Sequence, residues 1–319
     1  MKRLLLAALL ALVAGAAQAE DKVSLRLNWL TYGFHMPFQL GVGRGIYKRH
    51  GIDLTIGDGQ GSGRAVQVVA AGSDTFGLSD GASIIAGATK GAPVVAVMGI
   101  MNRSPYAVIA RADSGVTDFK GLAGKTVAAT TGEAGLVIFP ALLSANKMPP
   151  DAVRFLRIDG AAKLVSVLEN RVPAMLGDLE NQALILEQKN LKVVTLGYAD
   201  NGVNTEGLAI HTTRDTLRDK PDMVRRFILA TRESFEAAEA DPAATVAAGL
   251  KAKPDLDRDL SMRQSQAGLK LVRSPAGADK PIGWMAAEDW NQTLALMKQY
   301  QELTTDLPAS SFWTNDYLP

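Results

Sequence analysis

Short apolar segments alternate with amphipathic segments over the first two thirds of the chain, and this alternation restricts the fold to the α/β class. The first block contains four segments that read as strands, at 23–28, 52–56, 75–78 and 93–98. Helical segments separate them at 37–50, at 64–71 and from Asp80 onward. Strands that are regularly separated by helices form mostly parallel sheets with helices on both faces, so we expect this arrangement here.

A second block of the same kind begins near residue 112. Its predicted strands lie at 125–129, 153–158, 173–176 and 193–196, with predicted helices at 133–146, 161–170 and 180–189. From Glu206 the chain becomes mostly helical. Within 221–241, Val224, Phe227, Ile228, Thr231 and Phe235 recur at helical spacing and predict one buried face; a further helix is expected over 284–300.

The order of these blocks predicts two lobes, one inserted into the other. We assign residues 20–110 and 206–319 to the first lobe and residues 111–205 to the inserted lobe. The chain would cross between them near 107–112 and 197–207. Two crossings of this kind provide a hinge, which lets two lobes close on a ligand.

Residues 1–19 have the three parts of a cleavable secretory signal peptide. Lys2 and Arg3 form the positive region, residues 4–16 the apolar region, and residues 17–19, Ala-Gln-Ala, the cleavage site. The chain has no cysteine, which excludes disulfides, thiolate metal sites, a cysteine nucleophile and a lipid anchor on cysteine. We therefore expect a soluble protein of the periplasm.

Charge and motifs narrow the function further. Removing Lys2 and Arg3 reduces the 34 basic residues to 32, against 33 acidic ones, so no basic surface for nucleic acid is expected. The sequence lacks a nucleophile elbow, an HExxH motif and a dinucleotide-binding GxGxxG, and its three histidines are scattered. We expect a monomeric binding protein with no cofactor or metal, and not an enzyme.

Ligands of α/β sheets bind beyond the carboxyl ends of the strands, where helix N-termini leave N–H groups free. The first such junction is rich in aromatic residues. Trp29 and Tyr32 suit a planar ligand by stacking, whereas we assign Phe34 and Phe38 to the core. His35 is either a ligand contact or a structural histidine.

Other junctions of the first lobe offer polar groups. Ser62 lies in the glycine-rich segment 59–63, which is either a ligand loop or a flexible turn. Ser79 and Asp80 precede a helix, where they would also act as ordinary N-caps. Arg103, before the first crossing, is the one cation we place near the site, although it could equally be a surface residue.

The inserted lobe adds Thr131, Glu133, Asp178 and Glu180 at its own helix starts. The helix dipole alone explains acidic residues there. Around one cavity, however, these acids and Asp80 would repel a small oxyanion and accept hydrogen bonds from amino or ring N–H groups.

Several segments together resemble the NMT1/THI5-like (SsuA/TauA/ThiY-related) group of periplasmic solute-binding components of ABC importers. The resemblance covers essentially the whole mature chain. It rests on Trp29, His35, Pro37 and Phe38, on segments 45–54, 60–63, 66–72 and 76–80, and on the terminal segment 312–318.

This resemblance implies a type II periplasmic-binding-protein fold and delivery of a solute to a membrane permease and its ATPase. It also implies a ligand similar to the pyrimidine precursors of thiamine, with His35 and Glu180 at matching positions. Some cytoplasmic relatives are enzymes that make this pyrimidine, and they carry a cysteine-rich motif. Because this chain has no cysteine and a signal peptide, we expect a carrier.

Three hypotheses follow from the sequence. The favoured one is a binder of a planar heterocycle, stacked on Trp29 and Tyr32 and hydrogen-bonded by the acids. The second is a binder of an aromatic carboxylate, a sulfonate or another small anion, held by Arg103 and helix N-termini. The third, a periplasmic enzyme, lacks a recognisable catalytic set.

Overall fold

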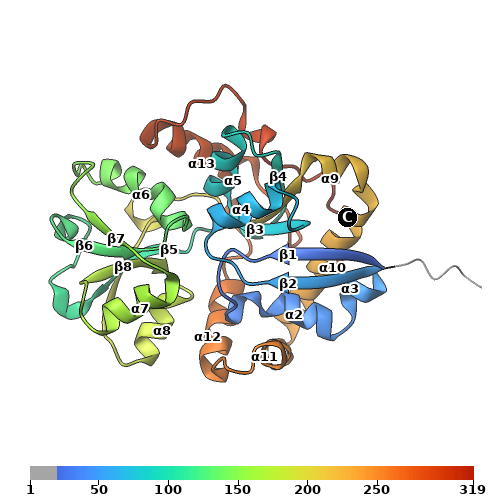
Figure 1. Ribbon diagram of the computed structural model, residues 1–319, viewed down its shortest axis with the longest axis horizontal. Coiled ribbons are helices and arrows are strands. Elements are labelled where there is room, and N and C mark those ends of the chain that lie inside the picture. The colour runs from blue at the N-terminus through green and yellow to red at the C-terminus, as the bar shows by residue number, and fades with distance from the viewer. Residues whose placement is uncertain (1–19) are drawn as a thin grey trace, which may run out of the picture.

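Two five-stranded sheets, each covered by helices, organise the chain (Figure 1). The computed structural model describes residues 20–319, and the predicted signal peptide lies outside the described residues. The strands are β1 Asp21–Arg26, β2 Ile52–Gly57, β3 Phe76–Asp80, β4 Val94–Met101, β5 Tyr106–Arg111, β6 Thr126–Ala129, β7 Arg154–Arg157, β8 Ala174–Asp178, β9 Val193–Gly197 and β10 Leu208–Thr213. The helices are α2 Met36–Gly43, α3 Ile46–Arg49, α4 Ser62–Ala70, α5 Gly81–Thr89, α6 Ala134–Ala145, α7 Gly160–Leu168, α8 Gln182–Gln188, α9 Arg214–Asp219, α10 Pro221–Ala240, α11 Pro242–Ala252, α12 Arg258–Leu269 and α13 Ala287–Tyr300.

Each sheet contains one reversed strand that the sequence did not predict. The strand orders are β2-β1-β3-β10-β4 and β7-β6-β8-β5-β9. Strand β10 pairs antiparallel with β3 and β4, and β5 pairs antiparallel with β8 and β9. The other four strands of each sheet share one direction. The expectation of a mostly parallel sheet is therefore confirmed, with one reversed strand per lobe, which is the first strand after each crossing.

The two crossings join the lobes at residues 102–105 and 198–207. Strand β5 already pairs within the second sheet, so the first crossing lies before Tyr106, earlier than the lobe boundary at 110 that the sequence suggested. In Figure 1 the lobe with β5 to β8 and α6 to α8 lies on the left, and the lobe with β1 to β4 lies on the right. Two α/β lobes with two hinge segments constitute the type II periplasmic-binding-protein fold.

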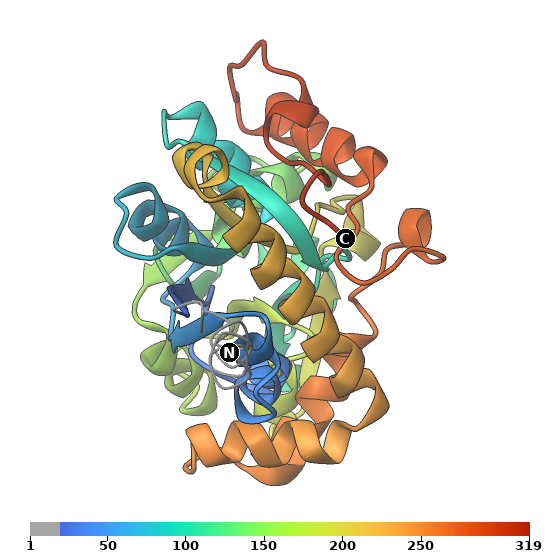
Figure 2. The ribbon, with the colours of Figure 1, turned by 90° about the vertical axis from the view of Figure 1, so that its right-hand side faces the viewer.

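Helix α10 shows how the amphipathic pattern builds the core of the first lobe. It begins at Pro221, whose fixed φ suits the first turn of a helix. Its predicted apolar face is buried, and Phe227 stacks on Phe76 of β3 with ring centroids 4.0 Å apart. Burying one phenylalanine stabilises the fold by roughly 1.5–3 kcal/mol. Figure 2 shows α10 as the long golden helix that runs across this lobe.

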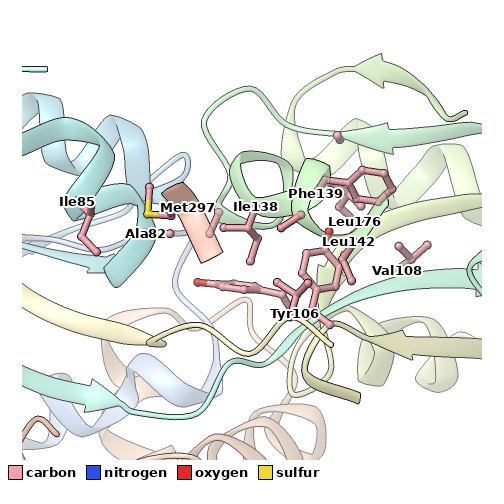
Figure 3. Close-up of a cluster of buried hydrophobic side chains, with 14 of the residues drawn as sticks. Ala82, Ile85, Tyr106, Val108, Ile138, Phe139, Leu142, Leu176 and Met297 are labelled. Carbon is pink, nitrogen blue, oxygen red and sulfur yellow. The ribbon is translucent and has the colours of Figure 1, made fainter. Parts of the chain in front are cut away.

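A hydrophobic cluster connects the lobes on one side, and we call it the apolar seam. Ala82 and Ile85 of α5 and Met297 of α13 belong to the first lobe, whereas Ile138 of α6 belongs to the second, and all four are buried in one cluster (Figure 3). Tyr106, at the start of β5, projects into the same cluster. The seam shows that the lobes are packed together on this side.

Within residues 20–319, no helix combines the length and apolar character needed to span a bilayer.

Candidate functional site

A small cavity of about 30 Å³ lies between the two lobes. The first lobe lines it with Asn28, Trp29, Gly61 and Ser62, and the second with Tyr106, Glu133, Ala134, Gly135, Lys163, Leu176, Gly177, Asp178 and Gln182. Asp178 is the last residue of β8, and Ser62 begins α4. The cavity thus lies where α/β sheets place their ligands, beyond strand ends and beside helix starts.

A buried ion pair forms one wall of this cavity. Glu133 is the N-cap residue of α6, and its Oε2 pairs with Nζ of Lys163 in α7. The Lys163 side chain is only 1% exposed. Its Nζ also lies 4.9 Å from the centroid of the Trp29 ring, which comes from the other lobe. The positive charge of Lys163 is therefore neutralised by Glu133 and shared with an aromatic face across the lobes.

The remaining ionisable groups of the site are acids. Oε1 of Glu133, Oδ2 of Asp80 and Oε2 of Glu180 are buried with no hydrogen-bond partner in the described part of the chain. Burial raises the pKa of Asp178 to about 7, opposed by Lys163 and reinforced by the charges of Glu133 and Asp80. Burial, followed by the charge of Asp178, also raises the pKa of Glu180 well above its usual value. One oxygen of each of Glu133, Asp80 and Glu180 thus lacks a hydrogen-bond donor, and of these three residues only Glu133 lines the cavity, where a ligand could provide one.

Two hydrogen-bonded bridges, which we call the interlobe clasp, close the cavity on the side of α12. The hydroxyl of Tyr32 donates to Oε1 of Glu180 at 2.8 Å. Next to it, Oε1 of Gln264 accepts from the Gly33 N–H at 3.1 Å, while its Nε2 donates to Oδ1 of Asn181 at 2.8 Å. Gln264 thus joins the Tyr32 loop of the first lobe to the start of α8 in the second.

Two glycines allow the close approach of these segments. A Cβ on Gly33 would lie 2.2 Å from the Ser261 carbonyl oxygen of α12. Gly61 has a φ of +111°, and a Cβ there would lie 2.7 Å from the Gly132 carbonyl oxygen of the opposite lobe. The neighbouring Gly63 N–H donates to that same oxygen at 3.1 Å. The structure therefore presents the closed arrangement of the lobes.

Four of the predicted site residues line the cavity: Trp29, Ser62, Glu133 and Asp178. Tyr32 and Glu180 lie beside it in the clasp, so the Tyr32 ring is not exposed for stacking inside the cavity. Thr131 lines a neighbouring groove that also borders Trp29.

The other predicted residues lie further from the cavity. Asp80 caps α5 by accepting from the Ser83 N–H at 2.9 Å, and its own N–H donates to the Ser62 hydroxyl at 3.2 Å. Ser79 donates to the Ser62 carbonyl and contacts Nε2 of His211. Arg103 is exposed and is not among the residues that line the cavity, which agrees with the surface position that the sequence left open for it.

His35 has a structural role in this arrangement. Its Nε2 lies 2.9 Å from Oδ1 of Asn28, and Asn28 lines the cavity. Burial lowers the pKa of His35 to about 3, so the ring is neutral. The histidine therefore orients a cavity residue. Phe34 and Phe38 are buried in the core, as predicted.

The cavity is also lined by four polar residues that were not predicted from the sequence, Asn28, Tyr106, Lys163 and Gln182. Of these four, Lys163 was the most predictable from the sequence, because it lies among apolar residues near the start of a predicted helix, and a buried lysine requires a charged partner. Asn28 precedes Trp29 directly, at the end of the first strand where a ligand contact is expected. Tyr106 and Gln182 carried no such signal.

The profile of the family described as NMT1/THI5 like matches residues 34–245. The chain belongs to this family. It is 24% identical over 312 residues to a 4-amino-5-hydroxymethyl-2-methylpyrimidine phosphate synthase of Saccharomyces cerevisiae, covering 94% of this chain and 88% of that one. It is 22% identical over 307 residues to the riboflavin-binding protein RibY of Chloroflexus aurantiacus, covering 94% and 86% of the two chains.

These relatives correct one conclusion from the sequence. We expected that the chain is not an enzyme, but relatives that align with 94% of it are named as synthases. The conclusion is wrong, because this family includes enzymes as well as binding proteins.

Among solved structures, the alkanesulfonate-binding protein SsuA of Xanthomonas axonopodis pv. citri, bound to MOPS, is similar with a TM-score of 0.75. The two chains are 13% identical, and the match covers 93% of this chain and 99% of that one. At this identity the likeness establishes the fold alone.

Proposed function

We propose that this member of the NMT1/THI5-like family is the periplasmic substrate-binding component of an ABC importer, and that it captures a small planar nitrogen heterocycle of the pyrimidine type. The protein would deliver this ligand to a membrane permease that an ATPase drives. The observation that carries the proposal is the surplus of buried carboxyl groups at the interlobe cavity, with Lys163 as the one basic side chain lining it in the described chain.

The charge of the cavity supports a ligand with N–H donors. Glu133 already neutralises Lys163, which leaves Asp178 as the other acid that lines the cavity, while Glu180 lies in the clasp and Asp80 caps α5 next to Ser62. An amino or ring N–H group would donate to these carboxyl oxygens, and a positively charged ring nitrogen would favour their ionised form, whereas a carboxylate or sulfonate would oppose that ionisation.

The alternative ligand, a small anion, lacks its expected cation. That hypothesis relied on Arg103, which is exposed and outside the cavity lining. The names of the relatives add support for a heterocycle, because both riboflavin and the aminopyrimidine of the synthases are planar ring systems that contain nitrogen.

The arrangement of the lining residues also explains how binding could control closure. Trp29 and Ser62 come from one lobe, whereas Glu133 and Asp178 come from the other. A ligand that contacts both sets binds only the closed arrangement, and it therefore shifts the population toward that arrangement. The permease would then distinguish the loaded form by the surface that closure creates.

A ligand panel tests the proposal. Protein stripped of ligand by unfolding and refolding is mixed with aminopyrimidines, riboflavin, taurine or nitrate, and its melting temperature is recorded. We expect a rise with one of the heterocycles, and the same rise should be lost in Asp178→Asn but kept in Asp113→Asn, which changes an exposed carboxylate. A rise with taurine or nitrate alone would refute the heterocycle class.

The named relatives favour a second candidate, which is synthesis of a pyrimidine phosphate at the same cavity. Mass spectrometry of the purified protein incubated with bacterial extract would detect this activity as a pyrimidine phosphate formed in proportion to the protein added. Recovery of an unchanged bound heterocycle would instead support the carrier.

A further inference from the structure

The interlobe cavity is smaller than the ligand proposed for it. Its volume of about 30 Å³ has room for one or two water molecules, because a single water needs about 10–15 Å³ of such space. The ring of a planar heterocycle is several times larger than a water molecule and does not fit. When the lobes are closed around such a ligand, one of the lining side chains must therefore occupy a different position.

The groove beside the cavity, which we call the outer groove, offers space for a displaced side chain. It has a volume of about 480 Å³, within the range of about 300–1,000 Å³ that is usual for small-molecule sites. Among residues 20–319, Trp29 is the only one that lines both the cavity and the outer groove. Its indole therefore stands between the two spaces and can move from one toward the other.

The indole of Trp29 rests on a seat at the start of α7, in the opposite lobe. A Cβ on Gly160 would lie 2.5 Å from Cζ2 of Trp29, so only glycine at this position leaves room for the ring. One turn further along the same helix, Nζ of Lys163 lies 4.9 Å from the ring centroid and stabilises the ring by a cation–π contact. The seated ring thus depends on two residues of α7.

The place of Trp29 in the chain lets its side chain move without any change in the sheets. Trp29 lies after the end of β1 at Arg26 and before the short 3-10 helix Gly33–His35, outside regular structure, and it is half-buried. Its carbonyl oxygen accepts a hydrogen bond from the Gly59 N–H at 2.9 Å, which fixes the backbone. Rotation of the side chain is therefore the motion that would open the cavity.

We propose that Trp29 is a gate between the outer groove and the cavity, and that a planar ligand enters through the outer groove and binds in the space that the indole leaves. This inference rests on the proposed function. The seated indole competes with the ligand for this space, so the ligand binds only the fraction of molecules in which the ring has moved away. Gly160 and Lys163 set this fraction because they hold the ring.

Trp284 provides a matched control for the gate. It is also half-buried, and its ring also lies against a glycine and a lysine. A Cβ on Gly277 would lie 3.1 Å from this ring, and Nζ of Lys280 lies 5.8 Å from its centroid. Trp284 lines neither the cavity nor the outer groove. Trp284→Ala therefore removes an indole in similar surroundings without changing the gate.

The test measures the association rate of 4-amino-5-hydroxymethyl-2-methylpyrimidine with the ligand-free protein by surface plasmon resonance. Minor conformations of proteins are populated at about 0.1–10%, so Trp29→Ala should speed association at least about tenfold by removing the gate. Gly160→Ala should also speed association, because the added Cβ displaces the indole from its seat. Trp284→Ala should leave the rate unchanged.

Two results would overturn the gate. Slower association in both Trp29→Ala and Gly160→Ala would show that the ligand binds against the seated indole, and wild-type rates in both would show that the ring does not obstruct binding. In either case the pyrimidine still binds, and the proposed function stands. If neither the wild type nor Trp29→Ala binds the pyrimidine or riboflavin while taurine or nitrate binds, the proposed function fails and the gate fails with it.

Discussion

Removing the positive charge of Lys163 should destabilise the protein by an amount that depends on pH. In Lys163→Met the side chain keeps its length and its apolar stem, but Glu133 loses its partner. The side chain of Glu133 is 9% exposed, and its other oxygen has no partner in the described chain, so water cannot readily replace the ammonium group. The carboxyl group will then take up a proton.

The size of the effect follows from the free energy needed to protonate this carboxyl. One pKa unit corresponds to about 1.4 kcal/mol and an ordinary glutamate titrates near 4.3, so the charge contribution is at most about 4 kcal/mol at pH 7 and about 1 kcal/mol at pH 5. Loss of the cation–π contact with Trp29 adds roughly 0.5–1 kcal/mol at both values. The difference between the two pH values isolates the ion pair.

Urea unfolding at pH 5 and pH 7 measures both numbers. The matched control is Lys192→Met, which removes an exposed lysine of the same lobe and should stay within about 0.5 kcal/mol of the wild type. The double variant Lys163→Met, Glu133→Gln should recover much of the stability at pH 7. An equal cost of Lys163→Met at both pH values would refute the view that Glu133 is a buried, charge-dependent partner.

Two further predictions concern closure and pH. Gln264→Leu should leave the Gly33 N–H and the Asn181 amide without their partners, and we expect it to raise the dissociation rate of a bound heterocycle. Arg263→Leu, which breaks an exposed interlobe ion pair with Glu187, should change this rate far less. Stopped-flow dissociation compares the two variants, and equal effects on the rate would contradict a special role for the clasp. Because the pKa of Asp178 is raised to about 7, the native protein binds more protons than the unfolded chain between about pH 4 and 7. The contribution of Asp178 to the free energy of unfolding is therefore complete below about pH 4 and is lost as the pH rises to about 7. Asp178→Asn should flatten that part of the stability profile in chemical unfolding, and an unchanged slope would contradict the raised pKa.

The sequence predicted the lobes' helices and parallel strands because their periodicity is local. The apolar residues of α10, for example, recur at the 3.6-residue period of a helix and can be recognised from neighbouring residues alone. The reversed strands β5 and β10 escaped prediction because their sequences, YAVIAR and LAIHTT, are short and buried along nearly their whole length. Such strands lack the alternation that marks a half-buried strand, and their direction depends on partners far away in the sequence.

The site residues that lie at strand ends and helix starts could be predicted from the sequence. Trp29, Ser62, Glu133 and Asp178 occupy such positions and line the cavity. The partners across the lobes were not predictable, because nothing near Gln264 in the sequence indicates that α12 reaches both Gly33 and Asn181. The sequence left Arg103 open between the site and the surface, because a position beside a crossing does not specify the direction of a long side chain.

The central claim is that the closed interlobe cavity selects a planar ligand with N–H donors over an anion. The most direct test is calorimetric titration of the ligand-free protein with 4-amino-5-hydroxymethyl-2-methylpyrimidine and, separately, with taurine, at pH values on either side of the pKa of Asp178, which is about 7. We predict that the aminopyrimidine binds, more tightly above that pKa than below it because Asp178 is then ionised, and that taurine does not bind. Tight binding of taurine with no binding of the aminopyrimidine would contradict the account.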